Sequence, residues 1–155
     1  MVDRTMPAER DLLTTTAQLF GVVFLLVGIL GFIPGITSDA PGDFAGDGSE
    51  AELLGIFSVS ILHNIVHLLF GIVGLALART PEGARTFLVG GGVVYLLLWV
   101  VGLIGGLDWL PANSADHWLH FTLGVVLLGA GLLLGRGLVH LLSILNGKAS
   151  ANPAS

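Results

Sequence analysis

Long apolar stretches, separated by short polar turns, constrain the fold of this chain more than any other feature. The 155 residues are 54% hydrophobic and only 11% charged, and their mean hydropathy is +0.90. A soluble domain carries about 25% charged residues. Because a chain this short cannot hide so much apolar surface in one water-soluble core, we expect an integral membrane protein with a single domain.

Four of the apolar stretches are long enough for a helix to cross a bilayer, which takes about 20 residues. We therefore predict an all-α fold, a bundle of four transmembrane helices in a domain that spans residues 14–135. The helices are expected at about residues 14–33, 53–78, 86–105 and 115–135.

Turn-forming and capping residues place the predicted helix ends. Pro34 and Gly35 end the first helix, whose apolar run is too long for the core of a signal peptide. Asn113 or Ser114 can cap the fourth helix, with Asp116 in its first turn.

The segments outside the predicted helices are polar or small. Residues 1–13 are expected to form an N-terminal tail and residues 147–155 a disordered C-terminal tail. Leucines at helical spacing in residues 136–146 indicate a short interfacial helix or extra turns of the fourth helix. The loop at residues 36–52 carries only acidic charges, whose spacing does not fit an EF-hand, so we expect a solvated loop.

The basic residues predict the orientation of the bundle. With four spans, all six lie on the same side as both termini: Arg4, Arg10, Arg79, Arg85, Arg136 and Lys148. By the positive-inside rule this side is cytoplasmic, so both termini are predicted in the cytoplasm.

The two halves of the chain resemble each other. Gly21–Leu26 (GVVFLL) matches Gly92–Leu97 (GVVYLL), an offset of 71 residues between the first and third predicted helices. His67 matches His120, an offset of 53, and each of these histidines is followed four residues later by a glycine. This pattern predicts a parallel two-helix repeat, related by a pseudo-two-fold axis along the membrane normal.

Two polar groups interrupt the apolar stretches, one in Leu62–His67 and the other in Asp116–His120. Ionisable side chains at membrane depth are costly and usually face a protein interior. Histidines three or four residues apart share one helix face. We therefore expect one polar cluster between the second and fourth helices, and its candidate metal ligands are His63, His67, His117 and His120, with Asn64 and Asp116 orienting the rings from behind.

Three interpretations of this cluster stay open. In the first, the histidines and Asn64 hydrogen-bond across helices and serve packing only. In the second, the imidazoles bind a transition metal, for which zinc, copper, iron and nickel are suitable. In the third, one histidine from each helix holds a b-type haem. The chain has no cysteine, which excludes disulfides, thiolate-ligated metals and iron–sulfur clusters.

Glycines continue the faces that carry the histidines. Small residues let membrane helices approach closely. We therefore expect the second and fourth helices to pack face to face through Gly71, Gly74, Gly124 and Gly131.

The sequence also narrows the classes of function and partner. The net charge of −5 and the lack of a basic patch argue against nucleic-acid binding. No glycine-rich phosphate loop, Gly-x-Ser-x-Gly motif or pair of carboxylates at membrane depth is present, which favours a protein that is not an enzyme. The lipid bilayer is the expected partner, and a homo-oligomer or a larger membrane complex stays open.

Three motifs together resemble a known family. They are the segment from His63 to Gly71, the helix end from Gly28 to Gly35, and Asp116-x-Trp118-Leu119-His120. They are similar to a family of small four-helix bacterial membrane proteins, mainly actinobacterial, called domain of unknown function 4383. The resemblance covers roughly Thr14 to Gly135. It implies four spans and a multi-pass protein of the bacterial inner (plasma) membrane, and it brings no established activity, substrate or catalytic residue.

Overall fold

The computed structural model describes residues 5–39, 44–45, 50–105 and 112–134 of the chain. The fold is all-α, as predicted, apart from one small antiparallel hairpin. In chain order its elements are α1 (Thr5–Leu30), β1 (Glu52–Leu53), β2 (Phe57–Ser58), α2 (Ile61–Leu77), α3 (Pro81–Leu103) and α4 (Ser114–Leu133).

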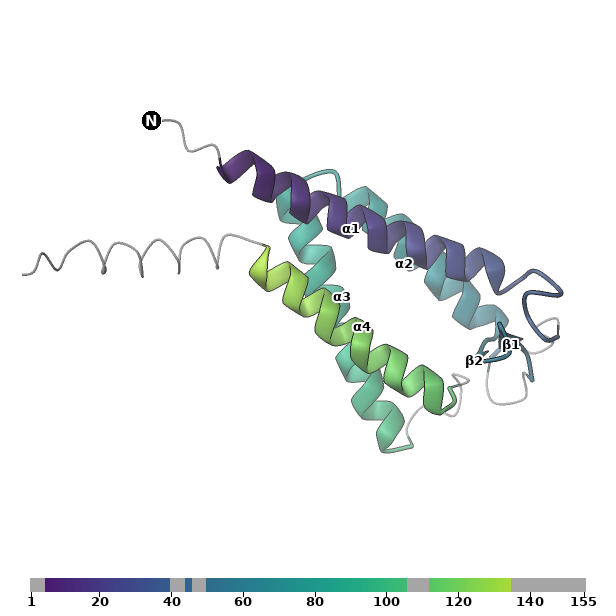
Figure 1. Ribbon diagram of the computed structural model, residues 1–155. Coiled ribbons are helices and arrows are strands. Elements are labelled where there is room, and N and C mark those ends of the chain that lie inside the picture. Colours follow the sequence, from purple (N-terminus) through teal and green to yellow (C-terminus); the bar gives the residue numbers. More distant parts are fainter. Residues whose placement is uncertain (1–4, 40–43, 46–49, 106–111, 135–155) are drawn as a thin grey trace, which may run out of the picture.

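The helices associate as two pairs of sequence neighbours. Helix α1 lies along α2, and α3 lies along α4 (Figure 1). The two pairs meet through smaller contacts of α3 with α1 and α2. A tight turn at Ala78–Thr80 connects the pairs, and the β1–β2 hairpin lies at the opposite end, beside the starts of α2 and α4 (Figure 1).

In the part of the chain that the structure describes, three helices are long and apolar enough to cross a membrane: Leu12–Leu30 within α1, Pro81–Leu103 and Ser114–Leu133. Helix α2 is also apolar but has only 17 residues. The outward faces are rich in large aliphatic side chains, such as Leu19 at 62% exposed and Leu97 at 58%. Because an apolar exterior suits lipid and not water, the chain is a helical, multi-pass membrane protein.

Helices α1 and α3 begin earlier than predicted. Helix α1 begins at Thr5, within the predicted tail, and Pro7 lies in its first turn, where a missing N–H is tolerated. Helix α3 begins at Pro81, because the hydroxyl oxygen of Thr80 accepts a hydrogen bond from the Gly83 N–H at 3.1 Å. The predictions for residues 136–146 and 147–155 lie outside the described residues.

Helix α2 begins at Ile61, eight residues later than predicted. The Ser60 hydroxyl caps it by accepting a hydrogen bond from the His63 N–H at 3.1 Å. The residues before Ser60 form the β1–β2 hairpin instead, with Leu53 opposite Phe57. Its turn has positive φ at two successive positions, 58° at Leu54 and 67° at Gly55, the left-handed conformation that tight hairpin turns use.

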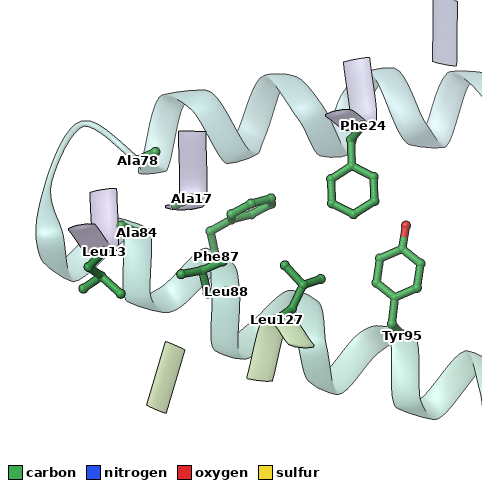
Figure 2. Close-up of a cluster of buried hydrophobic side chains, with 9 residues drawn as sticks. All are labelled: Leu13, Ala17, Phe24, Ala78, Ala84, Phe87, Leu88, Tyr95 and Leu127. Carbon is green, nitrogen blue, oxygen red and sulfur yellow. The ribbon is translucent and has the colours of Figure 1, made fainter. Parts of the chain in front are cut away.

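Most of the core lies between the two helix pairs, near the α2–α3 turn and in the middle of the bundle (Figure 2). Phe24 of α1 and Tyr95 of α3 point toward one another, with ring centroids 5.5 Å apart and ring planes 13° apart (Figure 2). A smaller cluster, centred on Leu53 and Val59, packs the β1–β2 hairpin against the end of α1.

The predicted face-to-face packing of α2 and α4 through glycines is wrong. A Cβ atom built on Gly71 would lie 2.7 Å from Cγ of Leu25 in α1, and one built on Gly124 would lie 2.7 Å from Cγ of Leu96 in α3. The other two glycines of the prediction, Gly74 and Gly131, also face α3. The glycines instead lie at the contacts of each helix with its neighbour in the sequence. Short connections favour such pairing between consecutive helices.

Candidate functional site

Two histidines of α2 stack one turn apart. The Ser60 cap places His63 in the first turn of α2, and His67 follows four residues later. Their ring centroids are 4.4 Å apart and their ring planes 8° apart. Nδ1 of His67 lies 3.0 Å from the carbonyl oxygen of His63, which can only accept a hydrogen bond. A neutral His67 ring therefore carries its proton on Nδ1 and keeps a lone pair on Nε2.

Helix α4 brings a third histidine to this pair. The ring of His120 is 5% exposed and its centroid lies 6.5 Å from that of His63. The ring of Tyr95 in α3 also lies near His120, with 5.4 Å between the two ring centroids. We call His63, His67 and His120 the histidine cluster. Its aromatic neighbours are Tyr95 and Phe24, whose ring lies 5.8 Å from that of His67.

The fourth predicted histidine does not stack on the rings of the histidine cluster, although it is near enough to His120 to interact with it electrostatically. The ring of His117 packs against Gly102 of α3, where a built Cβ would lie 2.8 Å from the His117 Nδ1 atom. The ring contacts of the described residues do not include one between His117 and another histidine. The structure therefore brings together three of the four candidate ligands.

The two side chains predicted to orient the rings bind backbone groups. Asn64 is fully buried, and its Nδ2 donates at 2.8 Å to the carbonyl oxygen of Gly31, the residue that follows α1. Asp116 is 2% exposed, and its Oδ2 accepts from the N–H groups of Asn113 at 2.8 Å and Ser58 at 3.1 Å. Among the hydrogen bonds of the described residues, none joins either side chain to a histidine ring.

The Asn113–Asp116 capping box begins α4 and also binds the β1–β2 hairpin. In addition to capping the helix, Asn113 donates from Nδ2 to the Ile56 carbonyl oxygen at 2.7 Å. Together with the bond from Ser58 to Asp116, this contact joins the β1–β2 hairpin to the first turn of α4. The capping box is visible in the sequence, but its partners in the hairpin, more than 50 residues away, are not.

Three buried polar atoms have no hydrogen-bond partner among the described residues: Nδ1 of His63, Nδ1 of His117 and Oδ1 of Asn64. A buried polar atom without a partner costs about 1–3 kcal/mol. Such atoms are places where a ligand or an ordered water would be accepted.

The same geometry limits metal binding. No group of three or more histidine, aspartate or glutamate side chains in the described part of the chain is arranged to hold a metal ion. The physical reason is the stacking of His63 on His67. In nearly parallel rings the lone pairs lie in separate parallel planes, so they do not converge on one ion.

Its long apolar helices place this protein in the class of helical multi-pass membrane proteins. The histidine cluster is buried in the interior of the bundle. Within this class the chain belongs to the family described as "Domain of unknown function (DUF4383)", which matches residues 14–133. This confirms the family resemblance drawn from the motifs. No curated protein and no solved structure matches the chain.

Proposed function

We propose that the protein is a structural or accessory membrane protein without enzymatic activity, and that its buried polar residues hold the helices together. The hydrogen bond from Asn64 in α2 to Gly31 at the end of α1 carries this proposal. Within a bilayer, polar side chains that bond between helices add to the packing of small residues. Asp116 acts in the same way when it ties α4 to the β1–β2 hairpin.

The substitution Asn64→Leu tests this role, because leucine has the same number of side-chain heavy atoms and the same branching at Cγ, with no polar atom. We expect it to lower the free energy of unfolding in detergent by roughly 0.6–1.7 kcal/mol, from the average to the largest value measured for hydrogen bonds between membrane helices. The matched control is Ile65→Leu, at the exposed neighbouring position. An unchanged thermal midpoint for Asn64→Leu would mean that this bond does not hold α2 on α1.

The two-helix repeat belongs to the same proposal, and contacts between helices support it. Gly21 faces Leu75, and the residues at offsets of 71 and 53, Gly92 and Leu128, also face each other. In the same way, the contact of Gly71 with Leu25 corresponds to that of Gly124 with Leu96.

The aromatic contacts and the helix caps follow the same offsets. Phe24 lies 5.8 Å from His67, and the corresponding pair, Tyr95 and His120, lies 5.4 Å apart. The N-cap residues Ser60 and Asn113 are also 53 positions apart. Under this proposal the stacked rings of Phe24 and Tyr95 lie on the pseudo-two-fold axis.

We also propose that all four helices span the bacterial inner membrane, with both termini cytoplasmic. At about 1.5 Å per residue, the 17 residues of α2 reach the lower limit for a span. Four antiparallel spans place all six basic residues on one side. Reporter domains inserted at Gly46 and Gly83 should then be located outside and inside the cell respectively, and the reverse result would contradict this orientation.

A second candidate function is the binding of a transition metal or a b-type haem. The unpartnered Nδ1 atom of the buried His63 favours it, as does the approach of His63 and His120 from different helices. These two histidines would hold a haem through their imidazole nitrogens and would tune its redox potential. A three-histidine metal site fits less well, because His63 and His67 are stacked. Metal content and the visible absorption spectrum distinguish this candidate from the structural role.

A further inference from the structure

The turn of the β1–β2 hairpin displays two large aliphatic side chains. Leu54 is 65% exposed and Ile56 is 51% exposed, with Gly55 between them. We call residues 54–56 the hairpin tip. Leu54 has a φ of 58°, a left-handed conformation in which a bulky side chain is rare and strained. Asparagine, aspartate or glycine would suit this turn position better, so the turn itself does not explain the leucine.

The hairpin tip lies at the end of a candidate membrane span. Asn113, the N-cap of α4, donates to the carbonyl oxygen of Ile56 at 2.7 Å. Helix α4 is a candidate span that begins at the next residue, Ser114. Trp118, one turn further along, is 67% exposed, and tryptophan is enriched where membrane helices cross the lipid–water interface. The hairpin tip therefore lies beside the end of α4 that carries the exposed Trp118.

All three N–H groups of the hairpin tip and one of its carbonyl oxygens are hydrogen-bonded within the protein. The N–H groups of Leu54, Gly55 and Ile56 donate to the carbonyl oxygens of Ile36 at 2.8 Å, Glu52 at 3.3 Å and Leu53 at 3.1 Å. The Ile56 carbonyl accepts from Asn113. Backbone polar groups that enter lipid must be bonded internally. The hairpin tip meets this condition for its three N–H groups and the Ile56 carbonyl, although it is a turn and not a helix.

We propose that the hairpin tip is an interfacial membrane anchor, which inserts Leu54 and Ile56 into the headgroup–acyl boundary beside the start of α4. Lipid fits better than a protein partner because two side chains offer far less than the roughly 800 Å² per partner of a stable protein interface. The anchor would hold the starts of α2 and α4 at one depth, because the hairpin is connected to both. This proposal needs the membrane location of the chain and is independent of the role of the histidine cluster.

The depth of a tryptophan placed at the tip tests this proposal. The natural tryptophans Trp99, Trp109 and Trp118 are first replaced by phenylalanine, and Leu54→Trp or Ile56→Trp is then added to the full chain. Ile56→Trp avoids the left-handed position, so it covers the case in which Leu54→Trp does not fold. Each variant is placed in phosphatidylethanolamine–phosphatidylglycerol nanodiscs, in which the lipids carry bromine either near the headgroup or deep in the acyl chain.

Two matched variants calibrate the depth: Val93→Trp at the middle of α3 and Asp39→Trp in the outer loop, both at exposed positions. We expect lipids brominated near the headgroup to quench the tip tryptophans most strongly, and aqueous acrylamide to quench them less than the tryptophan at 39. Quenching by acrylamide equal to that at position 39 would overturn the proposal. Protection from both quenchers, which indicates a protein contact, would overturn it too.

Discussion

Nδ2 of Asn64 donates a hydrogen bond to the carbonyl oxygen of Gly31, 2.8 Å away, at the end of α1. The contact needs a glycine, because a Cβ atom on residue 31 would overlap the amide of Asn64. A fully buried amide thus meets a backbone carbonyl at a point where the neighbouring helix has no side chain. This contact is one of the direct polar links between two helices of the bundle.

Replacing Gly31 by alanine should therefore destabilise the fold. We expect Gly31→Ala to cost about 1–3 kcal/mol, the usual range for overpacking, because Asn64 must move and lose its acceptor. The control is Gly90→Ala on α3, where a Cβ meets open space and alanine gains about 0.5–1 kcal/mol through helix propensity. Thermal unfolding in detergent measures both. Equal midpoints for the two variants would be incompatible with the close contact.

The glycines at the two helix-pair interfaces should respond alike. Alanine at Gly71 would meet Leu25, and alanine at Gly124 would meet Leu96, at the same 2.7 Å. We expect both variants to lose about 1–3 kcal/mol of stability, and to a similar extent if the halves are true repeats. Gly129→Ala, where the added Cβ meets nothing, is the control within α4. A large loss at one position and none at the other would count against the repeat.

The histidine cluster should show energetic coupling that excludes His117. A double-mutant cycle of His63→Ala and His120→Ala should give a coupling energy of at least about 0.5 kcal/mol, because their rings lie 6.5 Å apart within one buried group. The same cycle with His117→Ala in place of His120→Ala should be additive, because that ring packs on Gly102. Coupling of His63 to His117 alone would show that the cluster is wrongly composed.

Loss of the Asp116 carboxylate should release the β1–β2 hairpin from α4. In Asp116→Ala the N–H groups of the half-buried Ser58 and Asn113 lose their acceptor, at about 1–3 kcal/mol for each that stays away from water. Amide hydrogen exchange at Ser58 should become faster, while Asp116→Asn, which keeps one acceptor oxygen, should have a smaller effect. Asp39→Ala, at an exposed carboxylate, is the control. Unchanged exchange at Ser58 would argue against this link.

The sequence predicted the apolar helices and the start of α4 well. It failed at the apolar run in which the β1–β2 hairpin is followed directly by α2. Asn113 and Asp116 indicated the start of α4, and that start is confirmed. The residues from Leu53 to Val59 are as apolar as α2 itself, so composition could not separate the hairpin from the helix. Ser60 and the Gly55 turn were the available local signals, and both are weak within an apolar segment.

The candidate site was predictable only as far as single helices determine it. Spacing by four residues places His63 and His67 on one face, and their rings do stack. Spacing by three did not decide which neighbour each ring on α4 meets, so His120 joins the cluster while His117 turns toward α3. For the same reason the glycine faces were recognised but assigned to the wrong partner helix.

The metal content and absorption spectrum of the protein purified from membranes test the central claim most directly. If the buried polar residues serve packing, the preparation should hold neither haem nor a transition metal in a one-to-one ratio, and His63→Ala should lower only its thermal stability. One haem or metal ion per chain would contradict the account if it were lost from His63→Ala and His120→Ala but kept in His117→Ala.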